Sequence, residues 1–253
     1  MSIASEIQRL QNDSSAIASA IATKGVTVPS GSGFDDYAGL IGQISGGGSV
    51  LPYTPLEYIQ TDGTAYINSK VIAKEPIAFD MKVKMNSSIS AGEILVGVGN
   101  VDGNANTLNG LYRSVNNQGK IGYGYYYLYS SLLTISSFAN PIYVSTFLRN
   151  GSCVMGFKAE GGTSYTSVTN NRSRTVTTSL PMYIFASNVN GSPDWKASSG
   201  TRLYYMRIFC GSTFPMVAFD GIPVLYNGEY GLWDMVTNKF FGNAASGGAF
   251  TGA

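Results

Sequence analysis

The chain has 253 residues, enough for one large all-β domain with a small appendage or for two ordinary domains, and its 44% of hydrophobic residues allow a sizeable buried core. Charged residues are only 12%, the net charge is +1 and no basic block is present, so the usual electrostatic features of a nucleic-acid-binding protein are missing. The chain contains no histidine, which removes the commonest general base, the commonest metal ligand and every nucleophilic system built on histidine.

The N-terminus shows neither a basic region nor an apolar run of the length of a secretory signal. No stretch approaches the roughly 18 consecutive apolar residues of a membrane-spanning helix. We therefore expect a protein that is made in a cytoplasm, is not inserted in a membrane and does not use the standard export route.

Residues 2–23 predict a helix with a heptad seam. Three heptads are too short to be stable alone, so we expect several copies to associate around the seam, with Ser14 as a polar layer that weakens the packing. The alternative is an amphipathic helix that packs on its own domain. The seam positions follow alternating steps of four and three: Ile3, Ile7, Leu10, Ser14, Ile17 and Ile21.

A short second helix and a glycine-rich linker follow. Gly25 ends the first helix, and apolar residues return to helical spacing from Phe34 to Ile44. Residues 45–49, Ser-Gly-Gly-Gly-Ser, have the composition of a flexible linker. The predicted organisation is a helical attachment or oligomerisation module (1–45), a linker (46–50) and a second domain (51–253).

From residue 50 onward the period changes from 3.6 to 2. In residues 77–85 apolar side chains alternate with small or charged ones, as in a half-buried strand. No amphipathic helical stretch of ten or more residues interrupts the strands, so we predict a mainly β fold, an antiparallel two-sheet sandwich of jelly-roll type. Further strands are expected at 56–60, 64–68, 93–99, 110–115, 120–129, 142–148, 153–158, 164–168, 174–178, 182–187, 202–210 and 214–220.

Several turns can also be predicted. Asp62-Gly63 and Asn150-Gly151 separate alternating runs, which is the signature of a tight hairpin. Across the first of these we expect Tyr58 and Ile59 to pair with Tyr66 and Ile67. A further turn at residues 237–238 is expected to bring Trp233 near Phe240, and the two ends of the β region to lie in adjacent strands.

The two cysteines, Cys153 and Cys210, lie in apolar alternating stretches far apart in the sequence. We interpret them as small buried hydrophobic residues. A disulfide stays open, because it depends on whether their strands are neighbours.

The start and end of the β region carry a family resemblance: residues 51–68, 181–188, 202–208 and 231–241. These segments resemble the opening and closing strands of concanavalin-like, laminin-G-like sandwiches in phage and prophage tail or fibre proteins. Residues 25–29 (Gly-Val-Thr-Val-Pro) and 35–38 (Asp-Asp-Tyr-Ala) resemble the N-terminal module often joined to that sandwich. Residues 86–175 match only by pattern, and there a family member varies its binding loops.

The resemblance implies a structural component of a virion, such as a homotrimeric tail or head fibre. Such a protein displays a lectin-like domain that binds a glycan or protein of the bacterial surface, while its N-terminal module contacts other virion proteins. When several copies of a weak site share one stalk, binding of one copy raises the effective concentration of the others at the target surface. A modest affinity of each domain is then sufficient. The alternative is an architectural capsid or baseplate protein that never contacts a host.

A glycan-cleaving enzyme is a further alternative, because some concanavalin-like sandwiches are hydrolases. Such enzymes need two carboxylates across the bond, and the sandwich glucanases supply them in an E-x-D-x-x-E pattern, which does not occur here. We therefore predict no enzymatic activity, although carboxylates remote in sequence can still converge.

Residues 123–129 contain the densest aromatic run of the chain. Alternation places four tyrosines on one face of a strand, where they can stack on sugar rings: Tyr123, Tyr125, Tyr127 and Tyr129. The simpler interpretation, which we prefer, is that one face belongs to the core and the tyrosines of the other are scattered.

Two polar loops are weaker candidates for binding sites. Arg172 and Arg174 lie where they can bind carboxylated sugars, or simply form a solvated turn. Asp102, Asn104 and Asn106 alternate like part of a calcium loop but lack a closing glutamate, so an Asn/Gly-rich turn is the better interpretation. We expect no cofactor other than calcium, which laminin-G-like domains often carry.

Overall fold

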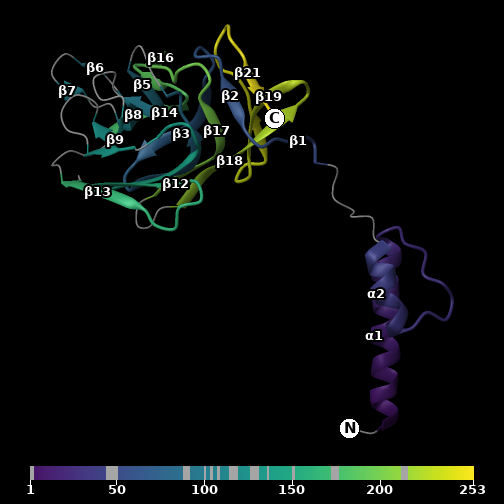
Figure 1. The fold of residues 1–253 in the computed structure, drawn as a ribbon. Coiled ribbons are helices and arrows are strands. Elements are labelled where there is room, and N and C mark those ends of the chain that lie inside the picture. The colour runs from purple at the N-terminus through teal and green to yellow at the C-terminus, as the bar shows by residue number, and fades with distance from the viewer. Residues whose placement is uncertain are drawn as a thin grey trace. The chain divides into compact units, whose positions relative to one another are not determined.

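The computed structural model describes residues 3–43, 51–87, 92–99, 101–102, 105–106, 109–113, 119–125, 131–135, 137–149, 152–171, 177–211 and 216–253. The chain forms two compact units, Met1–Pro52 and Tyr53–Ala253. The first is a pair of helices and the second is built of strands (Figure 1). In the described part of the chain, none of the helices combines the length and apolar character needed to span a membrane.

The N-terminal unit is a helical hairpin of α1 (Ile3–Thr23) and α2 (Phe34–Gln43). Helix α1 ends because Gly25 adopts a positive φ of 82°, which glycine tolerates without a steric penalty. At the start of α2 the Asp36 carboxylate accepts a hydrogen bond from the Gly33 amide at 2.9 Å. The two helices bury a small apolar cluster around Ile21, Tyr37 and Leu40.

The hairpin divides the predicted heptad seam. Ile21 is buried and Ile17 packs beside it, both within the same chain. Ser14 is not merely a weakening polar layer, because its hydroxyl lies 2.8 Å from the Tyr37 hydroxyl. The N-terminal part of the seam stays open, with Ile7 52% and Leu10 45% exposed. The Ile3 side chain lies outside the described atoms.

The C-terminal unit is an antiparallel sandwich of two sheets, which confirms the predicted mainly β fold (Figure 1). Within the described residues the larger sheet has 11 strands, in the order β13-β12-β11-β4-β17-β18-β19-β20, with β1, β2 and β21 joined to it. Their bounds are β13 (Thr166–Asn171), β12 (Ser152–Ala159), β11 (Ile142–Arg149), β4 (Ile77–Lys84), β17 (Arg202–Cys210), β18 (Met216–Tyr226), β19 (Glu229–Asp234), β20 (Lys239–Phe241), β1 (Thr54–Pro55), β2 (Ile59–Thr61) and β21 (Phe250–Gly252).

The smaller sheet has eight strands among the described residues, in the order β10-β9-β8-β5-β14-β3, with β15 and β16 at one side. One pairing in it is parallel, between β15 and β5. A separate two-stranded ribbon is formed by β6 and β7. The bounds are β10 (Ser131–Thr134), β9 (Lys120–Tyr125), β8 (Asn109–Arg113), β5 (Glu93–Gly99), β14 (Thr177–Ile184), β3 (Ile67–Lys74), β15 (Ser187–Val189), β16 (Ser192–Asp194), β6 (Val101–Asp102) and β7 (Ala105–Asn106).

Strand β4 shows how the alternating sequence builds the core. Its odd-numbered residues point between the sheets and are buried, while its even-numbered residues face outward. Phe79 meets Tyr123 of the opposite sheet edge to face, with ring centroids 5.6 Å apart. The inner faces of the two sheets thus form one continuous core.

Two of the predicted turns agree with the strand pairing. Strands β11 and β12 pair antiparallel as far as Arg149 and Ser152, on either side of the predicted turn, whose residues 150–151 lie outside the described part of the chain. Trp233 pairs with Phe240 across β19 and β20. The two ends of the β region also meet, because β2 pairs with β21.

The predicted hairpin at Asp62-Gly63 is wrong. Strand β2 pairs with β17 and β21, whereas β3 pairs with β14 of the other sheet, so the chain changes sheets here and the expected pairing of Tyr58 and Ile59 with Tyr66 and Ile67 does not form. Burial raises the pKa of Asp62, but amides donate to its carboxylate and hold that pKa well below its usual range. The donors are Thr64, Ala65 and Ala249. Through these hydrogen bonds Asp62 connects the loop between β2 and β3, where the chain changes sheets, to the C-terminal segment.

Neither of these two described cysteines forms a disulfide; Cys153 is buried and Cys210 is half-buried. Strands β11 and β4 lie between β12 and β17 in the sheet, so the two residues are not on neighbouring strands.

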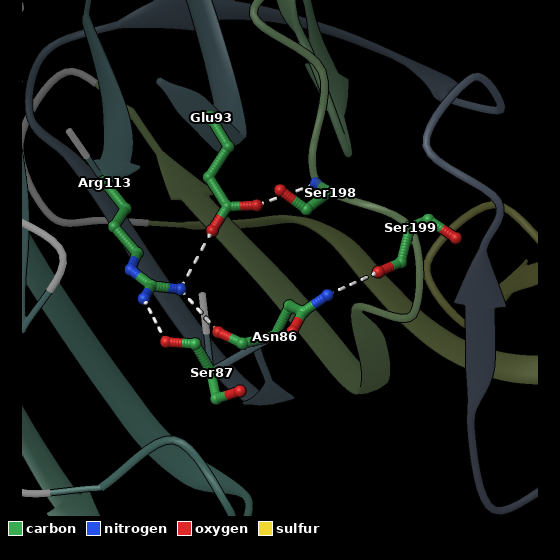
Figure 2. Close-up of polar contacts among 6 residues, drawn as sticks. All are labelled: Asn86, Ser87, Glu93, Arg113, Ser198 and Ser199. Atoms are coloured by element: carbon green, nitrogen blue, oxygen red, sulfur yellow. Dashed lines mark hydrogen bonds and ion pairs between the residues drawn. The ribbon is translucent and has the colours of Figure 1, made fainter. Parts of the chain in front are cut away.

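A buried ion pair connects β5 and β8 to the loops at one end of the sandwich. Arg113 is fully buried and lies 3.5 Å from the Glu93 carboxylate (Figure 2). Its guanidinium also donates to the backbone carbonyls of Asn86 and Ser87, at 2.5 and 2.9 Å. The second Glu93 oxygen accepts from the Ser198 amide at 2.7 Å. The Phe138 ring stacks on Arg113 with its centroid 4.1 Å from Cζ.

We predict that Arg113→Met lowers the free energy of unfolding by about 3–5 kcal/mol, because Glu93 is left as an unpaired buried charge. Urea denaturation of the full chain measures the change. The double variant with Glu93→Gln is the control, and it should recover part of the loss because the unpaired charge is gone. A loss of unfolding free energy in the double variant that equals or exceeds the loss in Arg113→Met would show that the unpaired Glu93 charge is not the cause of the destabilisation.

Candidate functional site

A row of small and charged side chains crosses the outer face of the larger sheet. The strand register aligns these positions across six neighbouring strands, and the alternation of each strand turns the side chains away from the core. In sheet order the row is Ser167, Gly156, Ser145, Asp80, Arg207 and Asp220.

The surface is hollowed above Gly156, in a depression of about 390 Å³ that we call the Gly156 pocket. This volume is within the range of small-molecule sites. Its lining is made of Asp80, Ser145, Thr146, Phe147, Val154, Gly156, Tyr165 and Ser167. A Cβ atom at position 156 would lie 3.4 Å from Cδ1 of Tyr165. A Cβ atom there would be in ordinary van der Waals contact with the ring, and the glycine leaves that volume to the depression.

Asp80 is the charged group of the Gly156 pocket. Its Oδ1 atom accepts a hydrogen bond from the Tyr205 hydroxyl at 3.3 Å. Burial raises the pKa of Asp80 above its usual value and outweighs the Tyr205 hydrogen bond and the Arg207 charge, which lower it. Arg207 is itself paired with Asp220 at 3.0 Å. Asp80 is thus a half-buried acceptor beside a neutralised ion pair.

Tyr165 supplies an aromatic wall and is 47% exposed. Burial raises its pKa, and the Asp80 charge adds to the shift. The Lys158 ammonium lies 5.5 Å from its ring centroid and 4.9 Å from that of Tyr143. An exposed ring next to a carboxylate and two hydroxyls can stack on the apolar face of a flat, polar ligand.

A β-bulge in β17 brings two successive tyrosines to the outer face. The register with β4 shifts between Leu203 and Tyr205, so Tyr204 is the extra residue. Both tyrosines consequently face outward between the buried Leu203 and Met206. Tyr205 reaches Asp80, and the ring of Tyr204 carries the Lys82 ammonium 4.6 Å from its centroid.

The first residue of the tyrosine run agrees with the preferred interpretation, in which one face belongs to the core, and not with the alternative of a binding ladder. Tyr123 is fully buried and packs against Phe79, because this face of β9 points between the sheets, so Tyr123 is not a ligand-binding residue. The Tyr125 side chain, Tyr127, Tyr129, Arg172 and Arg174 lie outside the described part of the structure.

The calcium candidates remain a prediction. Asp102 and Asn106 lie on the paired strands β6 and β7, but their side chains, like the whole of Asn104, are not described. Among the described residues, no group of three or more histidine, cysteine, aspartate or glutamate side chains is placed to hold a metal ion.

Sequence reasoning missed the Gly156 pocket. Carboxylates that are remote in sequence acquire basic partners in the fold, since Asp80 and Asp220 flank Arg207 and Glu93 pairs with Arg113. One local signal was available for the bulge, namely two polar aromatic residues between Leu203 and Met206 where strict alternation expects one. No local signal relates Asp80 to Tyr165, because they are 85 positions apart in sequence.

No protein-family model matches the chain, and neither does the sequence of any curated protein. Solved structures share its fold. A candidate carbohydrate-binding protein from Bacteroides ovatus superimposes with a TM-score of 0.51 at 10% identity, over 78% of this chain and 60% of that one. The CBM40 domain of the Ruminococcus gnavus IT-sialidase, bound to α2,3-sialyllactose, gives 0.43 at 17% identity, over 60% and 89%. A tailspike protein of an Escherichia coli O157:H7 bacteriophage gives 0.43 at 12%, over 64% and 24%. At these identities the similarity shows the fold alone.

We predict that Tyr205→Phe raises the pKa of Asp80 further, because the carboxylate loses the hydroxyl that donates to it. Carbon-detected NMR titration of the aspartate carboxyl groups measures the shift. Tyr204→Phe is the matched control, since that hydroxyl does not reach Asp80. A pKa of Asp80 that stays the same or falls would show that the hydrogen bond does not stabilise the ionised form.

Proposed function

We propose that the β-sandwich binds carbohydrate in the Gly156 pocket and does not cleave it. The observation that carries the proposal is the combination of an exposed ring, Tyr165, with the acceptor Asp80 in a lining that includes two serines and a glycine. Sugars have an apolar face that stacks on aromatic rings and hydroxyl groups that pair with carboxylates and serines. The Bacteroides ovatus protein of the same fold is described as a candidate carbohydrate-binding protein, which agrees with this proposal.

The proposal of binding without turnover rests on the arrangement of the acids. Asp80 and Asp220 are on strands separated by β17, so their Cα atoms are about 10 Å apart, and Arg207 lies between them. Arg207 pairs with Asp220 and keeps it from acting as a free acid opposite Asp80. A glycosidase needs its two carboxyl groups open to the same bond.

We predict that Gly156→Val weakens glycan binding by at least about tenfold, because the methyl groups of valine would occupy part of the pocket beside Tyr165. Tyr165→Ala should have a similar effect through loss of the stacking surface. A glycan array with the full chain identifies a ligand, and calorimetry with that ligand gives the affinities.

The matched control is Tyr226→Ala, which removes a half-buried aromatic ring of the same sheet outside the pocket. Unchanged binding in Gly156→Val and Tyr165→Ala would place the site elsewhere. Release of reducing sugar from the bound glycan would support the enzyme instead. A chain that binds no glycan would favour the architectural role.

We further propose that the chain is a fibre-type appendage of a bacteriophage virion, in which the helical unit assembles copies and the sandwich is displayed. The resemblance of residues 1–45 and of the ends of the β region to such proteins supports this. Separation into two units on either side of a glycine-rich segment suits a display protein. Assembly of several copies would compensate for a modest affinity of each sandwich.

Self-association is proposed to use the open part of the α1 seam. Ile7 and Leu10 are half exposed beside Phe34, around a groove of about 390 Å³. The ion pairs of Arg9 with Glu6 and Asp13 lie on α1 itself. The apolar groove is thus free to receive α1 of a second copy.

We predict that the full chain sediments as an oligomer, a trimer by family resemblance, and that Ile7→Ser with Leu10→Ser converts it to a monomer. Analytical ultracentrifugation measures the mass. Met216→Ser with Val217→Ser is the control, since it removes equally exposed apolar side chains from the sandwich. A monomeric parent chain, or an oligomer that survives the α1 substitutions, would contradict this assembly.

A further inference from the structure

The charge around the Gly156 pocket is distributed unevenly. Among the described residues that line it, Asp80 alone is charged. Two nearby cations are already neutralised, since Arg207 pairs with Asp220 at 3.0 Å and Lys82 with Glu160 at 2.6 Å. Lys158 is held over the rings of Tyr143 and Tyr165. Lys158 lies outside the pocket lining, so Asp80 is the charged side chain that a ligand in the pocket contacts directly.

The hydrogen-bonding capacity of Asp80 is only partly used. Oδ1 accepts from the Tyr205 hydroxyl, and no donor in the described part of the chain reaches Oδ2. An ionised carboxylate has about four acceptor positions and no donor, so it can take a hydrogen bond from each of two neighbouring hydroxyl groups. The Ser145 and Ser167 hydroxyls in the lining can donate or accept.

A carboxylated sugar would fit this arrangement poorly. Its carboxylate offers no proton to Asp80 and would stand a few ångströms from a like charge in a partly desolvated site, where the repulsion is stronger than in water. A neutral sugar with two adjacent hydroxyl groups offers two donors to Asp80 and an apolar face to Tyr165.

We infer that the Gly156 pocket selects neutral sugars that present two adjacent hydroxyl groups and discriminates against uronic and sialic acids. This inference rests on the proposed carbohydrate-binding function and specifies the class of its ligand. The discriminating residue is Asp80, which would touch the sugar directly.

The test compares sugars that differ only in the acidic group. Calorimetry with the full chain at pH 7.5 uses oligosaccharides ending in glucose or glucuronic acid, and in galactose or galacturonic acid. The neutral member of a pair should bind at least about tenfold more tightly. Asp80→Asn keeps the shape of the side chain and should weaken binding of the neutral sugar about tenfold. It should also reduce the difference in affinity between the neutral and the acidic sugar of each pair.

Glu229→Gln is the matched control, because it removes an exposed acid of the same sheet that lies outside the pocket lining and is not the partner of Arg207 or Lys82. It should leave the preference for neutral sugars unchanged. Thermal melting of each variant checks that the fold is retained.

The outcomes separate this inference from the function on which it rests. Equal or tighter binding of the uronic acids would overturn the selectivity and leave carbohydrate binding standing. Neutral binding that Asp80→Asn does not alter would overturn the role of Asp80. Failure of the parent chain to bind any sugar of either class on the array would overturn the proposed function itself, and this inference with it.

Discussion

The two-residue alternation of β4 is the constraint on which the sandwich and its outer surface both depend. This strand lies inside the larger sheet, paired with β11 on one side and β17 on the other. Its inward residues fill the core, and its outward residues include Asp80 and Lys82. A slip of one residue would bury those charges and expose Phe79 and Met81, so the register is strongly fixed. The same register aligns the polar row from Ser167 to Asp220.

Two departures from regular geometry turn this flat face into a recognisable site. The bulge in β17 adds a residue, so that Tyr204 and Tyr205 both point outward and Tyr205 can reach Asp80. Gly156 places no side chain on this face, so the space beside the Tyr165 ring stays open. Glycine weakens a strand interior, and its presence here fits a position where another group must come close.

Two acids of the sandwich, Glu93 and Asp80, have different roles. Glu93 is fully engaged by Arg113 and the Ser198 amide, in a network that joins loops distant in sequence (Figure 2). Asp80 keeps an accessible oxygen and a raised pKa, since burial opposes its ionisation and only one hydroxyl donates to it. A buried ion pair whose hydrogen bonds are all formed usually has a structural role. An acid in a depression with an acceptor oxygen that no donor uses is typical of a ligand-binding site.

The sequence alone determined the elements and the architecture of this protein. Heptad spacing indicated α1, and alternation located most strands of an antiparallel sandwich. These signals are local, because side-chain direction in a helix or strand repeats every few residues. Only the tertiary structure decided which strands are neighbours. It showed that Asp62-Gly63 changes sheets, that Tyr123 belongs to the core, and that Asp80, Gly156 and Tyr165 form one pocket. Those residues come together through non-local pairing of strands, and the register of that pairing is set by the packing of the whole core.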